Sequence, residues 1–229
     1  MIVAINQPAY LAWLGYYYRI ARADVFIRLD HVQFEKNSMV NRNKIKTANG
    51  PIMLTVPVKT SGKFGNLPIA ELQIDLSNNW SRKHMIAIKQ AYSKAAFFEE
   101  VYPNLEQIFL EKWTDLNKLL IRLDDFVLDY LGVKTKVMQS SMISAHGVKS
   151  ELILNLCKEL QATEYLSGPF GKDYLDLPSF MAAGIKVDFV EYQHPTYRQL
   201  HQDFIPNLSV FDLLFNYGKG SLNIILAGN

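Results

Sequence analysis

The chain has 229 residues, of which 49% are hydrophobic and 20% charged, enough to bury a sizeable core in one compact domain. No run of about 18 apolar residues predicts a membrane-spanning helix, and the first residues lack the pattern of a signal peptide, so we expect a cytoplasmic protein. The single cysteine, Cys157, excludes an internal disulfide and a multi-cysteine metal site.

The net charge of +2 is too small for a general nucleic-acid binder. Residues 1–66 carry nine lysines and arginines against three acidic residues, a local charge of +6, which leaves −4 for the rest of the chain. A local excess of cations suits a small anionic ligand, such as a phosphate, better than a long polyanion. We therefore expect a small anionic substrate, a nucleotide sugar among the candidates, and no nucleic acid. Oligomeric state, including a homo-oligomer, is left open.

The first thirty residues predict a β-α-β unit. Residues 2–6 form an apolar run typical of a central strand, apolar positions spaced by three or four predict a helix within 11–23, and 25–29 is a second buried strand. Such units close with parallel strands and a right-handed crossover. The loop after the first strand and the residues after the second should then face one crevice at the carboxyl end of the sheet.

The rest of the chain alternates predicted strands and helices. We expect strands at 52–58, 69–75, 134–138, 163–166 and 185–190, and helices at 80–92, 98–110, 113–130, 148–160 and 208–217. Gly132 is a predicted helix C-cap, and Ser209 with Asp212 has the spacing of a capping box. The pattern predicts a three-layer α/β fold with a mostly parallel, Rossmann-like sheet. We expect a single domain over 1–229, with a helical insertion at roughly 80–131.

A cation-rich segment follows the second strand. Its four cations lie within eleven residues and are interleaved with asparagines, which together supply many hydrogen-bond donors for a phosphate or carboxylate. The structural alternative is a hairpin turn rich in asparagine and lysine. The residues expected to bind substrate here are Lys36, Asn41, Arg42, Asn43 and Lys46, with Lys44 as the fourth cation.

Two residues are candidates for a general base. Asp30 ends an apolar strand, where a carboxylate could accept a proton or simply be solvated. His84 lies early on the predicted helix 80–92 and has a side chain that ordinarily titrates near neutral pH. A histidine on a helix surface is the structural alternative for His84.

Further substrate contacts are expected around the first loop and in a later turn. Gln7, Trp13 and Tyr16 lie near a predicted helix start, which can hold an anion on its free N–H groups. The two aromatic rings could stack on a base or sugar, although aromatic residues at this spacing are more often core. Ser167 and Gly168 form a turn after a strand that can present backbone N–H groups to an anion.

The sequence indicates no particular cofactor. The remaining histidines are scattered, and no carboxylate cluster completes a zinc or calcium site, so metal dependence is not predicted. Neither a Walker loop nor a G-x-G-x-x-G motif after a strand is present.

Several separated motifs resemble the bacterial WbqC-like family across nearly the whole chain. They are Gln7-Pro-x-Tyr-Leu-x-Trp-x-Gly-Tyr, Ala23-Asp-Val-Phe-Ile-x-Leu-Asp-x-Val-Gln-Phe-x-Lys, Asn41-Arg-Asn-x-Ile-Lys, Trp80-x-x-Lys-His84, Tyr165-Leu-Ser-Gly and Pro206-x-Leu-Ser-x-x-Asp-Leu-Leu-Phe-Asn-x-Gly218. Ala12 and Met39 depart from the expected pattern, which has proline and an aromatic residue there. The resemblance implies a role in surface-polysaccharide (O-antigen) biosynthesis, with acyl or aminoacyl transfer to amino sugars.

These observations lead to one main hypothesis and two alternatives. The main hypothesis is a transferase that attaches an acyl or aminoacyl group to the amine of a nucleotide-linked or phosphorylated sugar. In it, Arg42, Lys36 and Lys46 hold phosphate, Asp30 or His84 accepts the amine proton, and Gln33, Trp13 and Tyr16 contact the sugar or base.

The first alternative is ATP-dependent adenylyl or nucleotidyl transfer. It is suggested by a likeness to nucleotidyltransferases with an H-x-G-H motif, here with both histidines replaced by Trp13 and Tyr16. The second alternative is a non-catalytic ligand-binding or assembly protein.

Overall fold

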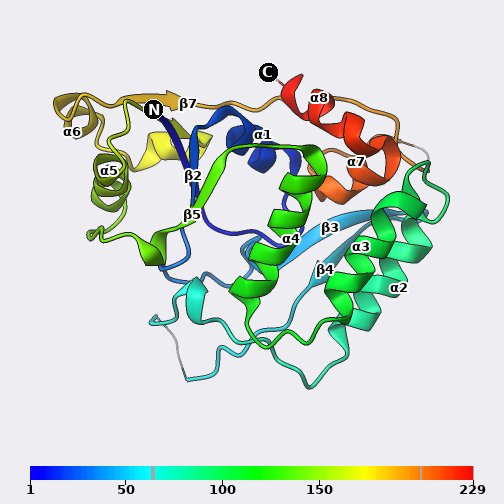
Figure 1. Cartoon of the computed structure of the whole chain (residues 1–229). Helices are drawn as coiled ribbons and strands as arrows, with labels where there is room; N and C mark the ends of the chain where they lie inside the picture. The colour runs from blue at the N-terminus through cyan, green and yellow to red at the C-terminus, as the bar shows by residue number, and fades with distance from the viewer. Residues whose placement is uncertain (63–64, 202, 229) are drawn as a thin grey trace.

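The chain opens with the predicted β-α-β unit. The computed structural model describes residues 1–62, 65–201 and 203–228 (Figure 1). Strand β1 (Ile2–Asn6) pairs in parallel with β2 (Val25–Arg28), and helix α1 (Leu14–Arg22) connects them. The helix starts three residues later than the predicted segment because Leu11 has a left-handed backbone, with φ of 45°, which a continuing α-helix does not allow.

Five parallel strands form the main sheet, in the order β5-β2-β1-β6-β7. The other three strands are β5 (Lys136–Gln139), β6 (Glu164–Ser167) and β7 (Lys186–Phe189). From β1 the chain moves outward through β2 to β5, then crosses back to β6 and moves outward on the other side to β7. The direction of winding therefore reverses between β1 and β6, which is where open α/β folds bind ligands.

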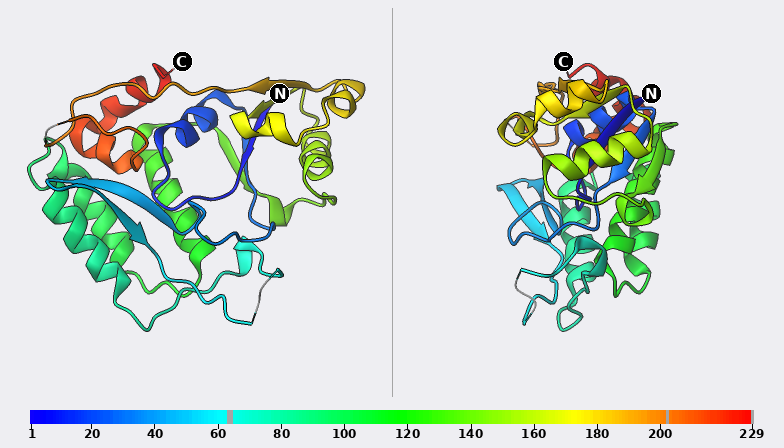
Figure 2. Two further views of the ribbon diagram at one scale, coloured as in Figure 1. Left: turned by 180° about the vertical axis from the view of Figure 1, so that it is seen from behind. Right: turned by 90° about the vertical axis from the view of Figure 1, so that its left-hand side faces the viewer.

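Helices cover both faces of this sheet, which confirms the three-layer α/β prediction (Figures 1 and 2). Alternate strand residues face opposite layers. Val3 and Ile5 belong to a core with helix α5 (Ser150–Glu159) and with Phe180 of α6 (Leu177–Ala182). Ala4 and Phe26 belong to a larger core that includes α1 and the helical insertion.

The helical insertion contains α2 (Trp80–Tyr92), α3 (Phe98–Leu110) and α4 (Leu116–Leu131). The first two have the predicted bounds. The third begins after the predicted start at Trp113, because the Asp115 side chain caps it by accepting from the Lys118 N–H, and the Trp113 indole donates to the Ile108 carbonyl at 2.7 Å. Gly132 ends α4 in the left-handed conformation, as predicted.

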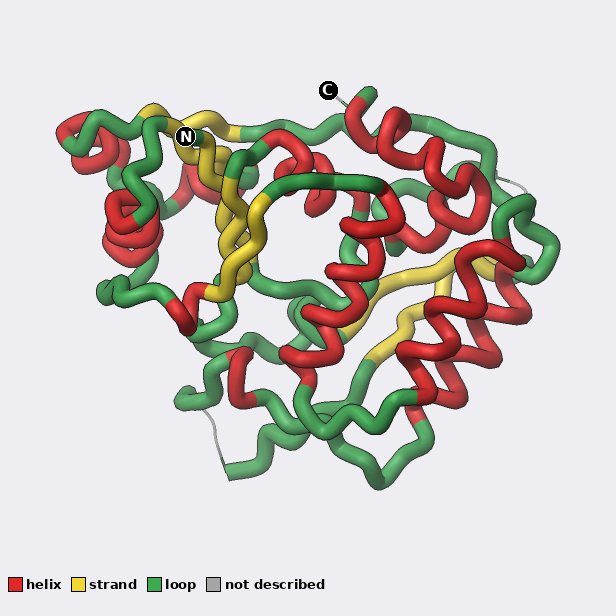
Figure 3. Tube along the Cα trace, in the orientation of Figure 1, coloured by secondary structure: helices red, strands yellow, loops and turns green. Residues whose placement is uncertain are grey.

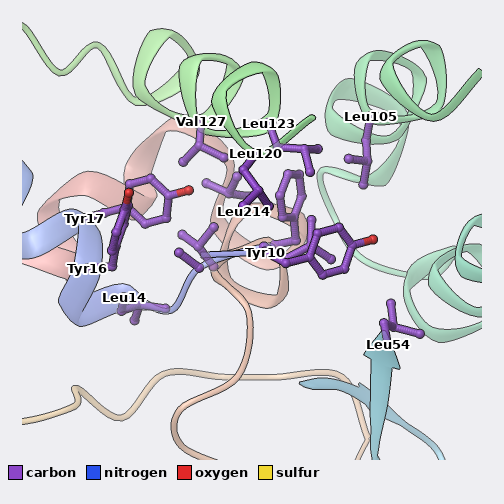
Figure 4. Packing of buried hydrophobic residues seen from close by; sticks show 14 of the residues in the cluster. Tyr10, Leu14, Tyr16, Tyr17, Leu54, Leu105, Leu120, Leu123, Val127 and Leu214 are labelled. Carbon is purple, nitrogen blue, oxygen red and sulfur yellow. The ribbon is translucent and has the colours of Figure 1, made fainter. Parts of the chain in front are cut away.

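The insertion and the first loop share one hydrophobic core. Figure 4 shows Tyr10, Leu14 and Tyr16 in the same cluster as Leu120 and Leu123 of α4, and all five side chains are buried. Burial of large apolar side chains of this kind is the main favourable term in folding, at roughly 25 cal/mol per Å² of apolar surface. The opening segment is therefore held by residues more than a hundred positions away.

A separate two-stranded antiparallel sheet corrects part of the prediction. Strands β3 (Arg42–Thr47) and β4 (Gly50–Thr55) form this hairpin, which lies outside the main sheet, as the tube in Figure 3 shows. The expected cation-rich loop is thus a strand, and the strand expected at 52–58 begins and ends earlier. Ile45 and Leu54 anchor the hairpin in the core. The strand expected at 69–75 is instead a 3-10 turn, Ile69–Glu71, after Pro68.

The chain ends in two helices, α7 (Val210–Tyr217) and α8 (Ser221–Leu226). Three short 3-10 turns complete the list: Ser140–Met142, Pro169–Asp173 and Gly218–Gly220. Ser209 caps α7 by accepting from the Phe211 N–H at 3.2 Å, but Asp212 does not complete the predicted capping box. Its buried carboxylate instead accepts from the hydroxyls of Tyr92 and Tyr197, at 3.0 and 2.9 Å.

In the described ranges, no helix combines the length and the apolar composition needed to cross a bilayer.

Candidate small-molecule site

A cavity of about 550 Å³ opens at the carboxyl ends of β1 and β6, where the winding of the sheet reverses. Ile5 and Asn6 end β1 on one side of it, and Ser167 and Gly168 end β6 on the other. Its volume lies in the range of pockets that enclose small organic ligands. The other lining residues are Trp13, Arg19, Met39, Asn43, Lys44, Tyr165, Pro169, Phe170, Gly171, Tyr174 and Asn207.

Arg19 is the unusual residue of the cavity wall. It lies on α1, is only 9% exposed, and donates to the Ile5 carbonyl at a long 3.5 Å. Burial lowers the pKa of Arg19, and within the described part of the chain no carboxylate forms an ion pair with it. A buried guanidinium without a counter-ion is costly unless a ligand supplies the negative charge.

The cavity as a whole is electropositive. Lys44, half-buried on β3, is a second cation in the wall, and none of the lining residues is aspartate or glutamate. Asn43 holds this part of the hairpin against the first loop, because its Nδ2 donates to the Leu11 carbonyl at 2.8 Å and its Oδ1 accepts from the Lys44 N–H at 2.8 Å. These two hydrogen bonds of Asn43 therefore fix the backbone of Lys44 beside the first loop.

Aromatic rings form much of the remaining wall. The Trp13 indole packs directly over Gly15, where an added Cβ would come within 2.4 Å of the ring, and its edge meets Tyr192 with ring centroids 5.6 Å apart. Burial raises the pKa of both Tyr165 and Tyr174, so these phenols stay neutral near pH 7 and act as hydrogen-bonding groups.

Of two glycines on the β6 side of the cavity, Gly171 is required for steric reasons, whereas Gly168 only packs in ordinary contact with Arg19. A Cβ on Gly168 would lie 3.4 Å from the Arg19 Nη1, and one on Gly171 would lie 2.0 Å from the Ser167 Oγ. The 3-10 turn Pro169–Asp173 can thus fold back over Ser167, with the Gly171 N–H donating to the Gly168 carbonyl at 3.0 Å. The turn brings the Ser-Gly segment and Arg19 to the same wall.

Comparison with known proteins decides the family. The model of the WbqC-like protein family matches residues 7–224 of the chain. The chain belongs to the WbqC-like family. It is also similar to an uncharacterized protein of Mycobacterium tuberculosis, Rv1507c, with 39% identity over 218 residues that cover 94% of each chain. No solved structure matches it.

In this WbqC-like chain, four of the residues expected to bind substrate line the cavity: Trp13, Asn43, Ser167 and Gly168. They come from the start of α1, from β3 and from the end of β6. The sequence placed the first loop at the carboxyl end of the sheet and the Ser-Gly turn after a strand, but it did not indicate that the two would share one wall.

Gln33 and Lys36 lie at a different cavity, of about 350 Å³, together with Phe34, Thr60 and Leu67. The Gln33 amide joins its own loop to the next one, accepting from the Leu67 N–H at 2.8 Å and donating to the Phe34 carbonyl at 2.9 Å. The single crevice expected for the loops after β1 and β2 is therefore two cavities in the structure.

Three residues of the expected anion site make structural contacts instead. Arg42 donates to the side chain and the carbonyl of Asn37. Asn41 donates to the Val56 carbonyl at 2.8 Å. The Lys46 side chain is buried, and its ammonium donates to the Gln199 Oε1 at 3.1 Å and to a backbone carbonyl. These bonds direct the three side chains to partners within the chain, while the buried Arg42 Nε has no partner among the described residues.

Tyr16 and Gln7 also lie outside the cavity wall. The Tyr16 hydroxyl is buried and points to Asp124 at 3.5 Å, so this ring belongs to the core (Figure 4). Gln7 is half-buried in the loop after β1. Tyr16 is thus a core residue, whereas Trp13 both packs against the core and lines the cavity.

Asp30 is 1% exposed and fully engaged in hydrogen bonds. Its Oδ1 accepts from the Ser140 hydroxyl and the Ser141 N–H, and its Oδ2 accepts from the Ser141 hydroxyl and the Asn117 amide, all at 2.9 to 3.0 Å. A carboxylate has about four acceptor positions, and these four bonds occupy them. The geometry favours a structural role that joins the ends of β2 and β5 to the start of α4.

His84 lies in a separate aromatic cluster with Tyr10, Trp80 and Phe109. Its Nδ1 is 2.8 Å from the Tyr10 hydroxyl. Burial lowers the pKa of His84 to about 4, so the ring is neutral at pH 7. Asp30 and His84 have different hydrogen-bond partners, and neither lines the cavity at β1 and β6.

Sequence reasoning missed Arg19 and Tyr174, and it named Lys44 only as the fourth cation of the cation-rich segment. A basic residue in the middle of an amphipathic helix ordinarily faces solvent, and nothing local marks Arg19 as an exception. Across residues 1–62, 65–201 and 203–228, no group of three or more His, Cys, Asp or Glu side chains is placed to hold a metal ion.

Proposed function

We propose that the cavity between β1 and β6 binds a phosphorylated or nucleotide-linked sugar, on which the chain acts as an acyl or aminoacyl transferase in surface-polysaccharide biosynthesis. The observation that carries the proposal is Arg19: a buried guanidinium, unpaired with any described carboxylate, in a wall that has no acidic residue. A phosphate would supply the missing negative charge.

Two further features support an anion at this position. Lys44 gives the wall a second cation, which suits a diphosphate better than a single carboxylate. Helix α1 begins beside the cavity at Leu14, so the positive end of its dipole adds to the positive charge of this wall.

The uncharged part of the wall suits the rest of such a ligand. Trp13 and Tyr174 offer faces on which a sugar ring or a base can pack. Asn6 and Asn207 offer amide groups that can donate to or accept from hydroxyls. This mixture of two cations, aromatic faces and amides is the chemistry that a nucleotide-linked sugar requires.

The transfer step rests on the family resemblance and stays a prediction. An amine must lose a proton before or as it attacks an acyl group. The two residues expected to accept that proton, Asp30 and His84, lie outside the cavity wall. The geometry therefore supports recognition of the sugar phosphate more directly than it supports a particular base.

Calorimetric titration of the purified protein with nucleotide sugars, sugar phosphates and Mg-ATP tests the proposal. We expect a nucleotide sugar to bind, and Arg19→Met to weaken that binding by roughly a hundredfold, which corresponds to the loss of about one charge-assisted bidentate contact. Arg19→Lys keeps the charge but not the planar guanidinium, so its affinity should lie between those of the wild type and Arg19→Met.

Arg82→Met is the matched control, because Arg82 is exposed on α2, away from the cavity. It should leave binding unchanged. Equal affinities for wild type and Arg19→Met would show that the phosphate binds elsewhere. Binding of Mg-ATP alone, with release of pyrophosphate when a carboxylic acid is added, would favour nucleotidyl transfer instead.

A further inference from the structure

Strand β7 is one edge of the five-stranded sheet, and its outer side is open to pairing. The N–H groups of Lys186 and Val190 donate inward to Thr163 and Ser167 of the β6 segment. Because backbone groups alternate along a strand, the N–H and C=O of Val187 and Phe189 point outward. No described residue accepts from or donates to these outward groups.

An exposed apolar surface lies beside this edge. A groove of about 630 Å³ runs between α6 and β7, lined by Leu177, Pro178, Met181, Ile185 and Val187. Met181 is 81% exposed, among the most exposed large apolar side chains in the described chain. An open strand edge next to exposed apolar residues promotes aggregation of a monomer, and a partner that covers both surfaces prevents it.

The charges on β7 indicate what that partner is. Within the chain the Lys186 ammonium lies 3.4 Å from Glu164 and the Asp188 carboxylate 3.9 Å from Arg22, and the Lys186 and Asp188 side chains remain 71% and 38% exposed, so both can also meet a charge on a second copy. Lys186 and Asp188 are two residues apart, so their side chains lie on the same face of the strand. If a second β7 pairs antiparallel with the first about a two-fold axis at Val187, Lys186 of each copy lies opposite Asp188 of the other. Val187 is then in a hydrogen-bonded pair with itself, as its outward N–H and C=O require.

We infer that two copies of this chain associate through β7, forming a continuous ten-stranded sheet with α6 of each copy packed against its counterpart. A two-fold interface must be self-complementary, and the outward backbone groups, the opposite charges and the apolar groove of this edge all meet that condition in one register. The inference is independent of the ligand proposed for the cavity.

The other edge of the sheet does not share these properties. Strand β5 reads Lys136-Val137-Met138-Gln139 and carries one cation with no acidic residue. A two-fold pairing there would create no opposite-charge pair, whichever register it took. The charge pattern therefore selects β7, rather than any exposed strand, for contact with a second copy.

Sedimentation velocity over a dilution series measures the association. We expect a monomer–dimer equilibrium for the wild type. Lys186→Asp places aspartates opposite one another, and Asp188→Lys does the same with lysines, so each variant alone should dissociate at least about tenfold more readily. Mixing the two variants pairs aspartates with lysines at both symmetric positions and should restore the dimer.

Met181→Glu should also weaken the dimer without affecting the fold, since Met181 is exposed in one chain. Met142→Glu is its control, because Met142 is equally exposed, at 79%, but follows β5. A monomer at every concentration would overturn the inference. So would a dimer that survives Met181→Glu and both charge reversals, because that dimer must use another surface.

Discussion

Arg28 on β2 and Asp124 on α4 form a buried ion pair, in which the guanidinium Nε donates to the carboxylate at 2.9 Å. Both side chains are less than a tenth exposed, and they lie 96 positions apart in the sequence. Asp125 approaches the same guanidinium at 2.6 Å from the solvent side. The pair fastens the helical insertion to the sheet that carries the candidate site.

Asp124→Ala should therefore destabilise the protein strongly. The substitution leaves Arg28 buried with only a partly exposed partner, and breaking a buried pair from one side typically costs about 3–5 kcal/mol. Asp125→Ala, the control, removes a carboxylate that is 52% exposed and should cost no more than about 1 kcal/mol. Urea denaturation measures both. Similar losses for the two variants would mean that Arg28 relies equally on the exposed carboxylate.

His84 should make the folded state sensitive to acid. Its pKa is about 4 when buried, against an ordinary value near 6.5, so below pH 6.5 the unfolded chain binds a proton that the folded chain does not. The contribution of His84 to the free energy of unfolding is fully present above pH 6.5 and declines as the pH falls to 4. The loss amounts to roughly 3 kcal/mol, at 1.36 kcal/mol per unit of pKa.

Measuring the free energy of unfolding between pH 7 and 4 tests this prediction. His84→Gln, which has no titrating ring, should flatten the decline, whereas replacing the exposed His146 by glutamine should not. If the pH dependence of His84→Gln matches that of the wild type, other groups cause the acid sensitivity.

Asp30 should prove to be a structural residue. Asp30→Ala removes the acceptor of four hydrogen bonds from Ser140, Ser141 and Asn117, and each donor left buried without a partner costs about 1–3 kcal/mol. Asp30→Asn keeps one oxygen, and the unpartnered Oδ1 of Asn117 can accept from the new amide. Thermal unfolding should therefore show a larger loss for alanine than for asparagine.

Ligand binding by the same two variants separates the structural role from the catalytic one. With a structural role, Asp30→Asn keeps both the affinity and any transfer activity close to wild type. A folded Asp30→Asn variant that binds normally but has lost transfer activity would restore Asp30 as the base.

The local sequence determined much of the succession of elements, although β3, α6 and α8 were not predicted. The spacing of apolar residues gives α2 and α3 their bounds, Gly132 ends α4, and the apolar runs 2–6 and 25–29 become β1 and β2, because these signals act within a few residues of one another. The parallel arrangement followed from the same pattern, since a strand, a helix and a strand in succession have few ways to pack. Trp13, Asn43, Ser167 and Gly168 could also be chosen from composition and position.

Only the tertiary structure decided what those side chains do. Whether Arg19 faces solvent or a cavity depends on where β6 and its turn lie, and those residues follow almost 150 positions later. From the sequence alone, Arg42, Lys44 and Lys46 are equivalent cations. In the structure Arg42 contacts Asn37 and Lys46 contacts Gln199, whereas Lys44 lines the cavity. A cation is available to a ligand only where the fold gives it no other partner, and that is a property of distant contacts.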